Sequence, residues 1–250
     1  MNGFTLFISD LHLQQETPHI TQNFIHFLQN KATYADALYI LGDFFEAWIG
    51  DDDRTPYHQD ISARLSALAK QGVAIYFMHG NRDFMIGKRF AKQSGFTLLS
   101  DPCSLDIYGL RILLSHGDLL CTLDEQHQKY RRIVLHPLFQ KTILLIPLFL
   151  RRHIAKKLRQ QSQQHHRYTT RDIGDVTPKA VDALMQQHQS PLLIHGHTHR
   201  PRIHTVKFGK RIVLGAWHDN AAYLQLFPNG HFELTSAKID GPVSAVPADQ

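Results

Sequence analysis

Five short apolar runs in this chain each end in a turn that carries aspartate, asparagine or histidine. The runs cover residues 4–9, 37–41, 73–78, 111–114 and 192–194, and their length and apolar content predict buried β-strands. Parallel strands bring their carboxyl ends to one edge of an α/β sheet, so we expect the polar side chains after these runs to form one site. These polar residues are Asp10, His12, Asp43, Asn81, His116, His197 and His199.

Each of these residues, taken alone, has a simpler explanation. A single histidine or aspartate after a strand is usually a structural residue that caps a loop, and glycines form turns in many proteins. The occurrence of five such turns in one chain argues against coincidence. Carboxylate oxygens, an amide oxygen and imidazole nitrogens together suit two borderline divalent cations such as Mn²⁺, Zn²⁺ or Fe²⁺.

Strand-like and helix-like segments alternate along the first 120 residues. This alternation predicts the α/β class, with parallel neighbours early in the chain and antiparallel neighbours later. The predicted amphipathic helices cover residues 17–28, 57–71, 84–94 and 178–188, and strand pairs are expected around residues 109, 208 and 229.

A helical segment at residues 124–175 interrupts this alternation. It holds eleven of the 27 lysines and arginines, has no Asp or Glu at residues 126–171, and contains an apolar block at residues 143–150. Such a charge block favours an anionic partner, which is a membrane surface, a nucleic acid or a phosphorylated substrate. In a simpler alternative, the apolar residues form only the core of the insertion. We expect a core of residues 1–123 and 176–236, a helical cap at 124–175, and a fraying tail at 237–250.

The composition argues against several classes of protein. The chain has two cysteines, Cys103 and Cys121, which favours a reducing compartment such as the cytosol over a disulfide-stabilised fold. The first apolar run is too short for a secretory signal and has no basic residue before it. No apolar run reaches the roughly 18 residues of a transmembrane helix. We therefore expect a folded domain without a membrane span.

The order and spacing of these motifs resemble the calcineurin-like metallophosphoesterase family. The matching motifs are D-x-H at residues 10–12, G-D at 42–43, G-N-x-D at 80–83, H-G at 116–117 and G-H-x-H at 196–199. The resemblance implies an α/β fold of four layers, αββα, in which two central sheets are flanked by helices. It also implies two metal ions bridged by Asp43. On this pattern Asp10, His12 and His199 complete one metal site, and Asn81, His116 and His197 complete the other.

Two bridged divalent metals suit the hydrolysis of a phosphate ester or anhydride. They lower the pKa of a shared water, which becomes the nucleophile, and they stabilise charge on the phosphoryl oxygens. The carboxylates of Asp83 and Asp118 either orient the ligands or cap their own loops. Many members of the family carry histidine where this chain has Arg82. Arginine does not release a proton, but its guanidinium can donate two hydrogen bonds to a phosphate. This residue therefore favours a phosphoanhydride substrate, whose leaving group needs no protonation.

Longer strings are similar to those of the UDP-2,3-diacylglucosamine diphosphatases, a family of lipid A biosynthesis. The strings are ISDLHL at residues 8–13, LGDFFEAWIGDD at 41–52, HGNRDF at 79–84, HGD at 116–118, HGHTHRP at 195–201 and LGAWH at 214–218. The resemblance implies hydrolysis of a pyrophosphate by water attack on the uridine-side phosphorus, which yields UMP and 2,3-diacylglucosamine 1-phosphate. It also implies Mn²⁺ and peripheral association with the cytoplasmic face of a bacterial inner membrane.

The same resemblance implies roles for individual residues. The implied catalytic residues are Asp43, Asn81, Arg82, His116 and His197. The implied substrate contacts are Asn81, Arg82, Asp124, Ser162, His166, Thr169 and His197. His166 and Thr169 depart from the asparagine and lysine of the family pattern. Asp124 has a second interpretation as the N-cap of a helix that begins at residue 125.

Three aromatic residues, Phe44, Phe45 and Trp48, follow the predicted bridging aspartate. Core packing is their default interpretation, and a place in an acyl or uridine pocket is the alternative. Three rival functions are a phosphatase of another substrate class, a metal-dependent scaffold and a nucleic-acid enzyme. The apolar block and the few aromatic residues of the insertion favour a lipid partner over nucleic acid. No obligate protein partner is evident from the sequence.

Overall fold

The computed structural model describes residues 3–168, 174–218 and 220–237. The strands are β1 (Thr5–Ile8), β2 (Ala37–Leu41), β3 (Ala74–Met78), β4 (Phe96–Leu99), β5 (Cys103–Ile107), β6 (Leu110–Ser115), β7 (Leu192–His195), β8 (Arg202–Val206), β9 (Gly209–Val213), β10 (Ala221–Leu226) and β11 (Phe232–Ala237). The helices are α1 (Pro18–Asn30), α2 (Pro56–Lys70), α3 (Lys88–Ser94), α4 (Glu125–Val134), α5 (Pro137–Leu144), α6 (Leu148–Tyr168) and α7 (Pro178–His188), with short 3-10 helices η1 (Ala32–Tyr34) and η2 (Asp118–Leu120).

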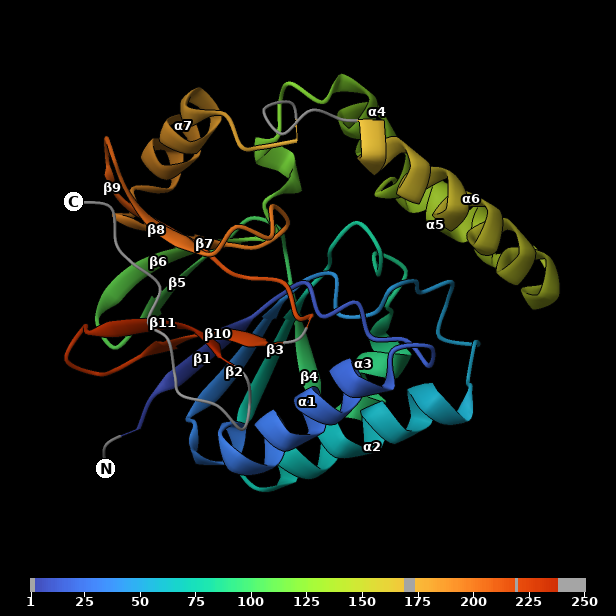
Figure 1. The fold of residues 1–250 in the computed structure, drawn as a ribbon, viewed down its shortest axis with the longest axis horizontal. Helices are drawn as coiled ribbons and strands as arrows, with labels where there is room; N and C mark the ends of the chain where they lie inside the picture. The colour runs from blue at the N-terminus through green and yellow to red at the C-terminus, as the bar shows by residue number, and fades with distance from the viewer. Residues whose placement is uncertain (1–2, 169–173, 219, 238–250) are drawn as a thin grey trace.

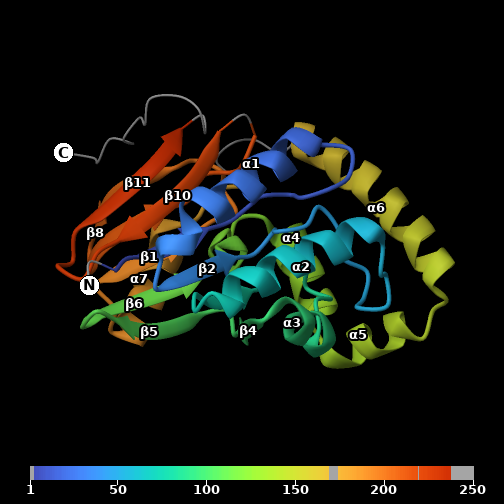
Figure 2. The same cartoon turned by 90° about the horizontal axis from the view of Figure 1, so that it is seen from below.

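Two sheets lie at the centre of the molecule (Figure 1). The first has the order β11-β10-β1-β2-β3-β4, in which β1 to β4 are parallel. The second has the order β5-β6-β7-β9-β8, in which β6, β7 and β9 are parallel. The predicted strand pairs form the antiparallel hairpins β5–β6, β8–β9 and β10–β11 at the sheet edges. Helices α1, α2 and α3 cover the outer face of the first sheet, and α7 covers the second (Figures 1 and 2).

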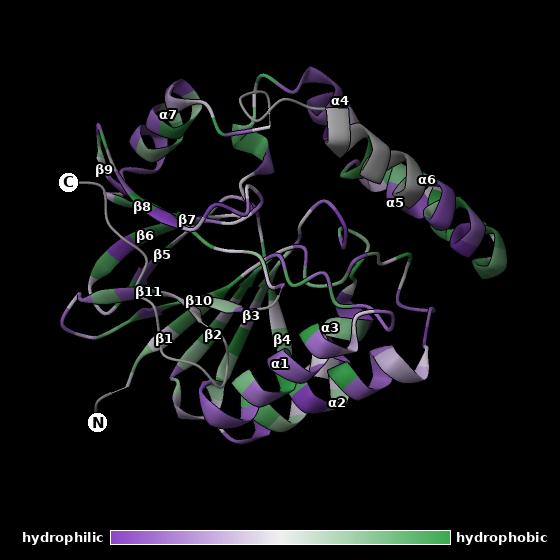
Figure 3. Ribbon diagram, viewed as in Figure 1, coloured by the Kyte–Doolittle hydropathy of each residue, from purple (hydrophilic) through white to green (hydrophobic). Residues whose placement is uncertain are grey.

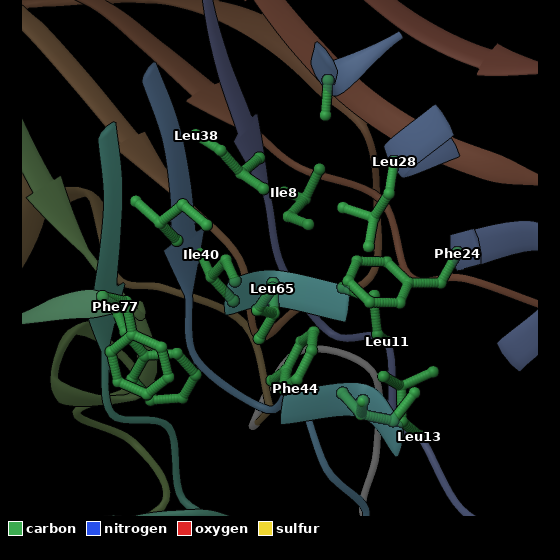
Figure 4. Packing of buried hydrophobic residues seen from close by; sticks show 14 of the residues in the cluster. Ile8, Leu11, Leu13, Phe24, Leu28, Leu38, Ile40, Phe44, Leu65 and Phe77 are labelled. Atoms are coloured by element: carbon green, nitrogen blue, oxygen red, sulfur yellow. The ribbon is translucent and has the colours of Figure 1, made fainter. Parts of the chain in front are cut away.

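Alternating side chains along the strands divide the core into three apolar layers. Leu6 and Ile8 of β1 pack against α1 and α2, whereas Phe7 between them faces the second sheet. Leu113 of β6 and Leu193 of β7 share a third cluster with α7. Figure 4 shows part of the first layer, where side chains of β1, β2, β3, α1 and α2 meet. Three apolar layers between four layers of secondary structure confirm the predicted αββα fold.

Local sequence explains where several helices begin. Pro18, Pro56 and Pro178 occupy the first turns of α1, α2 and α7, where the missing N–H of proline breaks no helical hydrogen bond. The Thr55 hydroxyl accepts a hydrogen bond of 3.1 Å from a backbone N–H in the first turn of α2. This contact is an N-cap, and it fixes the start of α2.

The structure differs from the prediction in two places. Strand β4 is not predicted from the sequence, and it forms at the sheet edge because it pairs in parallel with β3. Helix α3 begins at Lys88 rather than at residue 84. The carboxylate of Asp51 accepts hydrogen bonds of 2.9 Å from the backbone N–H groups of Gly87 and Phe90. A cap from a distant residue therefore sets the start of α3.

Helices α4, α5 and α6 lie outside the sandwich, on the side of the carboxyl ends of the parallel strands (Figure 1). Apolar residues occur along α5 and α6 as well as in the sheets (Figure 3). Part of the basic charge of this insertion is paired with the core, because Arg131, Arg151 and Arg152 form ion pairs with aspartates there. None of the helices in the described part of the chain combines the length and apolar content that a membrane span needs. The division into core and substrate cap stays a prediction.

Candidate dinuclear metal centre

The seven side chains that the sequence predicts as one site lie together at the carboxyl ends of five strands. Ligand atoms of two groups of three residues each lie within 4.8 Å of one another, and a seventh residue extends the second group. Asp10 and His12 follow β1, Asp43 follows β2, Asn81 follows β3, His116 follows β6, and His197 and His199 follow β7. The strand ends therefore converge in the structure, as the sequence predicts.

The first group consists of Asp10, His12 and His199. The Nε2 of His199 lies 3.3 Å from Oδ1 of Asp10 and 3.4 Å from Nε2 of His12. The backbone N–H of His197 and the hydroxyl of Ser9 donate hydrogen bonds of 2.9 and 2.5 Å to Oδ2 of Asp10, which fix its carboxylate. A carboxylate oxygen and two imidazole nitrogens that converge in this way form a ligand set for a divalent cation.

The second group consists of Asp43, His116 and His197, and Asp43 also faces the first group. Its Oδ2 lies 3.9 Å from Nε2 of His12, and its Oδ1 lies 3.7 Å from Nε2 of His116. Asn81 extends the second group, because its Oδ1 lies 3.0 Å from Nε2 of His116. The ring of His197 is 5.1 Å from that of His116. One carboxylate thus faces both groups, which is the arrangement that a bridging ligand needs.

The backbone at the candidate ligands has a conformation that L-residues rarely adopt. Asp10, His12, Asp43, His197 and His199 have φ values of 56°, 50°, 51°, 66° and 56°. Each left-handed residue of this kind costs on the order of 1–3 kcal/mol, so the surrounding structure must impose it. In the described ranges, only two other non-glycine residues share this conformation. Its concentration here indicates a geometry that serves function rather than folding.

The orientation of His116 depends on a close approach between two loops. Its Nδ1 lies 2.9 Å from the carbonyl oxygen of Leu41, so Nδ1 carries the proton and Nε2 is left to bind. Gly42, with φ of 86°, makes this approach possible. A Cβ at Gly42 would lie 2.6 Å from Nδ1 of His116 and 2.6 Å from the backbone nitrogen of Gly80.

A carboxylate orients His12 in a similar way. Oε2 of Glu46 lies 3.0 Å from Nδ1 of His12, and its side chain is 12% exposed. This contact leaves Nε2 of His12 facing Asp43 and His199. Glu46 lies within one of the diagnostic strings, but its role is not predicted from the sequence, because the contact joins two loops that are remote in the chain.

Replacing Glu46 with glutamine is expected to weaken Mn²⁺ binding about 10- to 100-fold, the usual result when a ligating histidine loses the carboxylate behind it. Calorimetric titration of metal-free protein with Mn²⁺ measures this change. Asp60→Asn, which removes an exposed carboxylate from α2, is the matched control and should leave the affinity unchanged. Equal affinities in Glu46→Gln and the wild type would contradict the role of Glu46.

The electrostatics of the site favour cations. Burial opposes a charge on His116, but nearby carboxylates, that of Asp43 first, raise its pKa to about 10. Burial also opposes a charge on Asp10, yet His199 and other histidines lower the pKa of Asp10 below its usual range. The carboxylates therefore exert a negative potential that a bound cation satisfies as well as a proton does. Together with the oxygen and nitrogen donors, this potential fits a two-metal centre.

The two aspartates with open roles, Asp83 and Asp118, both order the loops of the site. Asp83 is fully buried and accepts hydrogen bonds of 2.8 Å from the backbone N–H groups of Phe44 and Gly80. It therefore ties the loop after β2 to the loop after β3. Asp118 accepts a hydrogen bond of 2.9 Å from Nε of Arg131 and joins α4 to the loop after β6. These contacts favour the loop-capping interpretation for Asp83.

A cavity of about 520 Å³ lies beside the second group. Its polar lining residues are Glu46, Asn81, Arg82, Asp124, Gln126, His127 and Arg151. The Nε of Arg82 is buried and has no hydrogen-bond partner among the described residues, so its guanidinium is available to an anion. The remaining walls are largely apolar and include Trp48, Ile49, Phe84, Met85, Tyr130, Val134, Phe139, Ile143, Ile154, Ala155 and Leu158.

Four other residues are predicted to contact the substrate, and three of them, Asp124, Ser162 and His166, lie in the described part of the chain. Asp124 lines the cavity, and its Oδ1 also accepts a hydrogen bond of 2.9 Å from the backbone N–H of His127. The N-cap interpretation of Asp124 is therefore confirmed, and it is compatible with a place in the cavity wall. Ser162 and His166 fall within α6, and Thr169 lies outside the described residues.

The aromatic residues after Asp43 belong mainly to the core. Phe44 and Phe45 are fully buried, which confirms the packing interpretation. Trp48 packs on Phe90 with ring centroids 4.3 Å apart and also lines the cavity. His127 is not predicted from the sequence as a site residue, yet its ring lies 5.4 Å from that of His197. Its helical spacing with other cavity residues of α4, Tyr130 and Val134, is the signal that could have found it.

The sequence of this chain is similar to those of known proteins. The model of the calcineurin-like phosphoesterase family matches residues 5–201. The chain belongs to this family. This phosphoesterase is 53% identical over 240 residues to a UDP-2,3-diacylglucosamine hydrolase of Coxiella burnetii (strain Dugway 5J108-111), which covers 94% of this chain and 98% of the relative. It is 53% identical over 228 residues to the protein of that name from Aeromonas salmonicida (strain A449), with 90% of each chain covered. These relatives confirm the resemblance of the longer strings.

Solved structures share the fold of this phosphoesterase. Vacuolar Protein Sorting 29 from Cryptosporidium parvum has a TM-score of 0.53 at 13% identity and covers 98% of this chain and 96% of its own. A Vps29 variant from Entamoeba histolytica has a TM-score of 0.51 at 16% identity and covers 97% and 96%. Since fold alone does not imply function, these likenesses bear on architecture only.

Proposed function

We propose that this phosphoesterase hydrolyses the pyrophosphate bond of UDP-2,3-diacylglucosamine to UMP and 2,3-diacylglucosamine 1-phosphate in lipid A biosynthesis. The cavity carries the proposal, because it adjoins the candidate metal ligands at Asn81 and its walls are largely apolar. A substrate with a charged pyrophosphate and two acyl chains matches both parts. The name of the relatives at 53% identity supports the same substrate.

We propose two divalent ions, preferably Mn²⁺, as the cofactors. Asp10, His12 and His199 would hold one ion, Asn81, His116 and His197 would hold the other, and Asp43 would contact both. When bound, such ions supply positive charge to the phosphoryl oxygens and make a water more acidic. The buried carboxylates, their hydrogen bonds and the fixed imidazole tautomers support this assignment.

The reaction assigned to this site breaks the bond between the uridine-side phosphorus and the bridging oxygen. Water adds to that phosphorus, and the sugar 1-phosphate leaves as an anion that needs no protonation. Arg82 keeps its positive charge throughout, so it stabilises the charge that develops on phosphate oxygens without moving a proton. Asn81 and His197 complete the proposed phosphate contacts. Asp124, Ser162, His166 and Thr169 are proposed to contact the rest of the substrate.

Turnover of the lipid nucleotide by purified protein tests this function. With Mn²⁺ present, UDP-2,3-diacylglucosamine is expected to yield UMP and the lipid phosphate in equal amounts. A simple alkyl monoester such as glycerol 3-phosphate should be a much poorer substrate, because its alkoxide leaving group needs a proton that Arg82 does not supply. Fast turnover of the monoester without turnover of the lipid nucleotide would favour a phosphatase of another class. Inactivity toward both would favour a scaffold.

We also propose that the insertion associates with the cytoplasmic face of the inner membrane. Exposed apolar side chains beside basic ones favour binding to an anionic lipid surface. Leu145 is 84% exposed and Phe149 is 69% exposed, on either side of the turn between α5 and α6. Apart from Tyr34, the large apolar side chains exposed in the described ranges are Leu123, Tyr130, Ile133, Leu138, Leu144, Leu145, Phe149, Leu150, Ile154 and Leu158.

The double substitution Leu145→Glu and Phe149→Glu is expected to weaken binding to vesicles of anionic phospholipid by tenfold or more, since each side chain contributes roughly 1.5–3 kcal/mol when it leaves water. Co-sedimentation with vesicles measures this. Tyr34→Glu adds a charge at an exposed aromatic residue outside the insertion and is the control. Vesicle binding that is equal in the double variant and the wild type would contradict this docking surface.

A further inference from the structure

One buried arginine joins the insertion to the core at the edge of the cavity. We propose that Arg151 is a positioning residue whose ion pair with Asp52 fixes helix α6 against the loop at residues 46–53 and so sets the width of the apolar cavity. We call this pair the Arg151–Asp52 latch. The role in substrate binding rests on the proposed function, whereas the mechanical role of the latch does not.

Among the lysines and arginines whose burial the structure describes, Arg151 alone is buried, with 4% of its side chain exposed. Its guanidinium forks onto Asp52, with Nη1 2.9 Å from Oδ1 and Nη2 in contact with Oδ2. Nη1 also donates to the carbonyl of Ile49, and Nε donates to that of Ile146 at 2.9 Å. A buried charge is retained only where its partners are well placed, so these contacts hold α6 in one position.

The loop on the other side of the latch is attached to the core independently of Arg151. The carboxylate of Asp51 accepts hydrogen bonds of 2.9 Å from the backbone of Gly87 and of Phe90, and one of 3.2 Å from Nε1 of Trp48. These bonds anchor the loop to α3. Loss of the latch should therefore release α6 rather than the loop.

The face of α6 that the latch positions is a wall of the cavity. Ile154, Ala155 and Leu158 line the cavity and lie three, four and seven residues after Arg151, on the same side of the helix. Trp48 and Ile49 of the anchored loop line the same cavity. The distance between these walls therefore depends on the bond between Arg151 and Asp52.

The loop is shaped to admit the latch. Gly50 has φ of 134°, and a Cβ there would lie 2.5 Å from Nη1 of Arg151, 2.7 Å from Oδ1 of Asp52 and 2.8 Å from Cδ2 of Leu144. A side chain at Gly50 would compete with the guanidinium for the same space. Both the φ of 134° and the space taken by the guanidinium therefore favour glycine at this position.

The neighbouring arginine offers a matched control. Arg152 pairs with Asp53 at 2.5 Å, with 54% of the Arg152 side chain and 11% of the Asp53 side chain exposed. Each pair has one buried and one exposed partner, so what separates them is the number of bonds: among the described residues Arg152 bonds to Asp53 alone, whereas Arg151 also bonds to the carbonyls of Ile49 and Ile146. Removing Asp52 leaves the buried charge of Arg151 without its carboxylate, which is costly. Arg151→Gln and Arg152→Gln each remove one positive charge from adjacent positions of α6, and the latch predicts an effect for the first alone.

Hydrogen–deuterium exchange of the full chain tests the mechanical role. Arg151→Gln and Asp52→Asn are expected to accelerate exchange of the amides of residues 148–158 about tenfold or more, while residues 46–53 change less. The two substitutions combined should add nothing to the larger single effect, because both remove the same interaction. If Arg151→Gln does not fold, Asp52→Asn, at a residue with 47% side-chain exposure, still provides the test.

Steady-state kinetics test the role in substrate binding. Arg151→Gln is expected to raise KM for UDP-2,3-diacylglucosamine about tenfold, with hydrolysis of the small diester bis(p-nitrophenyl) phosphate within about twofold of wild type. Arg152→Gln should change neither. An unequal effect on the lipid and the small substrate is the signature of positioning, because a general loss of structure would reduce both activities.

The outcomes separate the latch from the proposed function. Faster exchange in α6 together with a raised KM for the lipid nucleotide supports the full proposal. Unchanged exchange in Arg151→Gln and Asp52→Asn overturns the latch, and faster exchange with an unchanged KM overturns its role in binding. Wild-type protein that cleaves the diester but not the lipid nucleotide overturns the proposed function, and exchange then still decides whether the latch exists.

Discussion

Replacing Asp43 with asparagine is expected to reduce hydrolysis of the lipid nucleotide by at least about 10³-fold, with little change in the fold. Asp43 faces both candidate metal groups, at 3.9 Å from Nε2 of His12 and 3.7 Å from Nε2 of His116. Asparagine keeps the shape and the oxygen that accepts the backbone N–H of Arg82, but it removes the negative charge. The loss should therefore appear in metal content as well as in rate.

Two measurements on the same sample check this prediction. Elemental analysis after Mn²⁺ loading gives the number of ions bound, and release of UMP gives the rate. Asp106→Asn, which removes an exposed carboxylate from β5, serves as the control and should behave as wild type in both. An Asp43→Asn protein with wild-type turnover would contradict the two-metal account and would favour a site that does not catalyse.

Replacing Arg82 with alanine is expected to lower kcat/KM for the lipid nucleotide about 10²- to 10³-fold while the metal content stays constant. Arg82 lines the cavity, and its buried Nε has no hydrogen-bond partner in the described part of the chain. We expect a phosphate group of the substrate to supply the missing partner. Unlike Asp43, Arg82 belongs to neither metal group. Loss of activity in Arg82→Ala can therefore be distinguished from loss of metal in Asp43→Asn.

Arg82→Lys gives a second test at the same position. Lysine keeps the charge but not the planar fork, so we expect it to recover only part of the lost activity. Arg89→Ala, at an exposed position of α3, is the control for the loss of a positive charge nearby. Full activity in Arg82→Ala would show that phosphate binding relies on other groups.

The metal groups were predictable from sequence because their geometry follows from a simple rule. Each candidate ligand lies within four residues of the end of a parallel strand, and parallel strands deliver their carboxyl ends to one edge. Apolar runs show where the strands end, so the sequence alone predicts that the ligands after these strands lie close together. The left-handed backbone at Asp10 or His199 is not visible in the sequence, since non-glycine residues rarely adopt it.

The supporting contacts were not predictable, because they join segments that are remote in the chain. Glu46 orients His12 from a different loop, and Asp51 starts α3 from 36 residues away. Arg151 and Asp52 are separated by 99 residues. In the sequence, Arg151 is one basic residue within a basic block, and only its burial separates it from Arg152. Periodicity reports which face of an element is apolar, not which charged partner it meets.

Hydrolysis of UDP-2,3-diacylglucosamine in ¹⁸O-labelled water tests the central claim most directly. Phosphorus NMR of the products shows which phosphorus received the oxygen of water. The account predicts that UMP carries the label and that 2,3-diacylglucosamine 1-phosphate carries none, because water adds to the uridine-side phosphorus. Label in the lipid phosphate, or no UMP from protein loaded with Mn²⁺, would contradict the account.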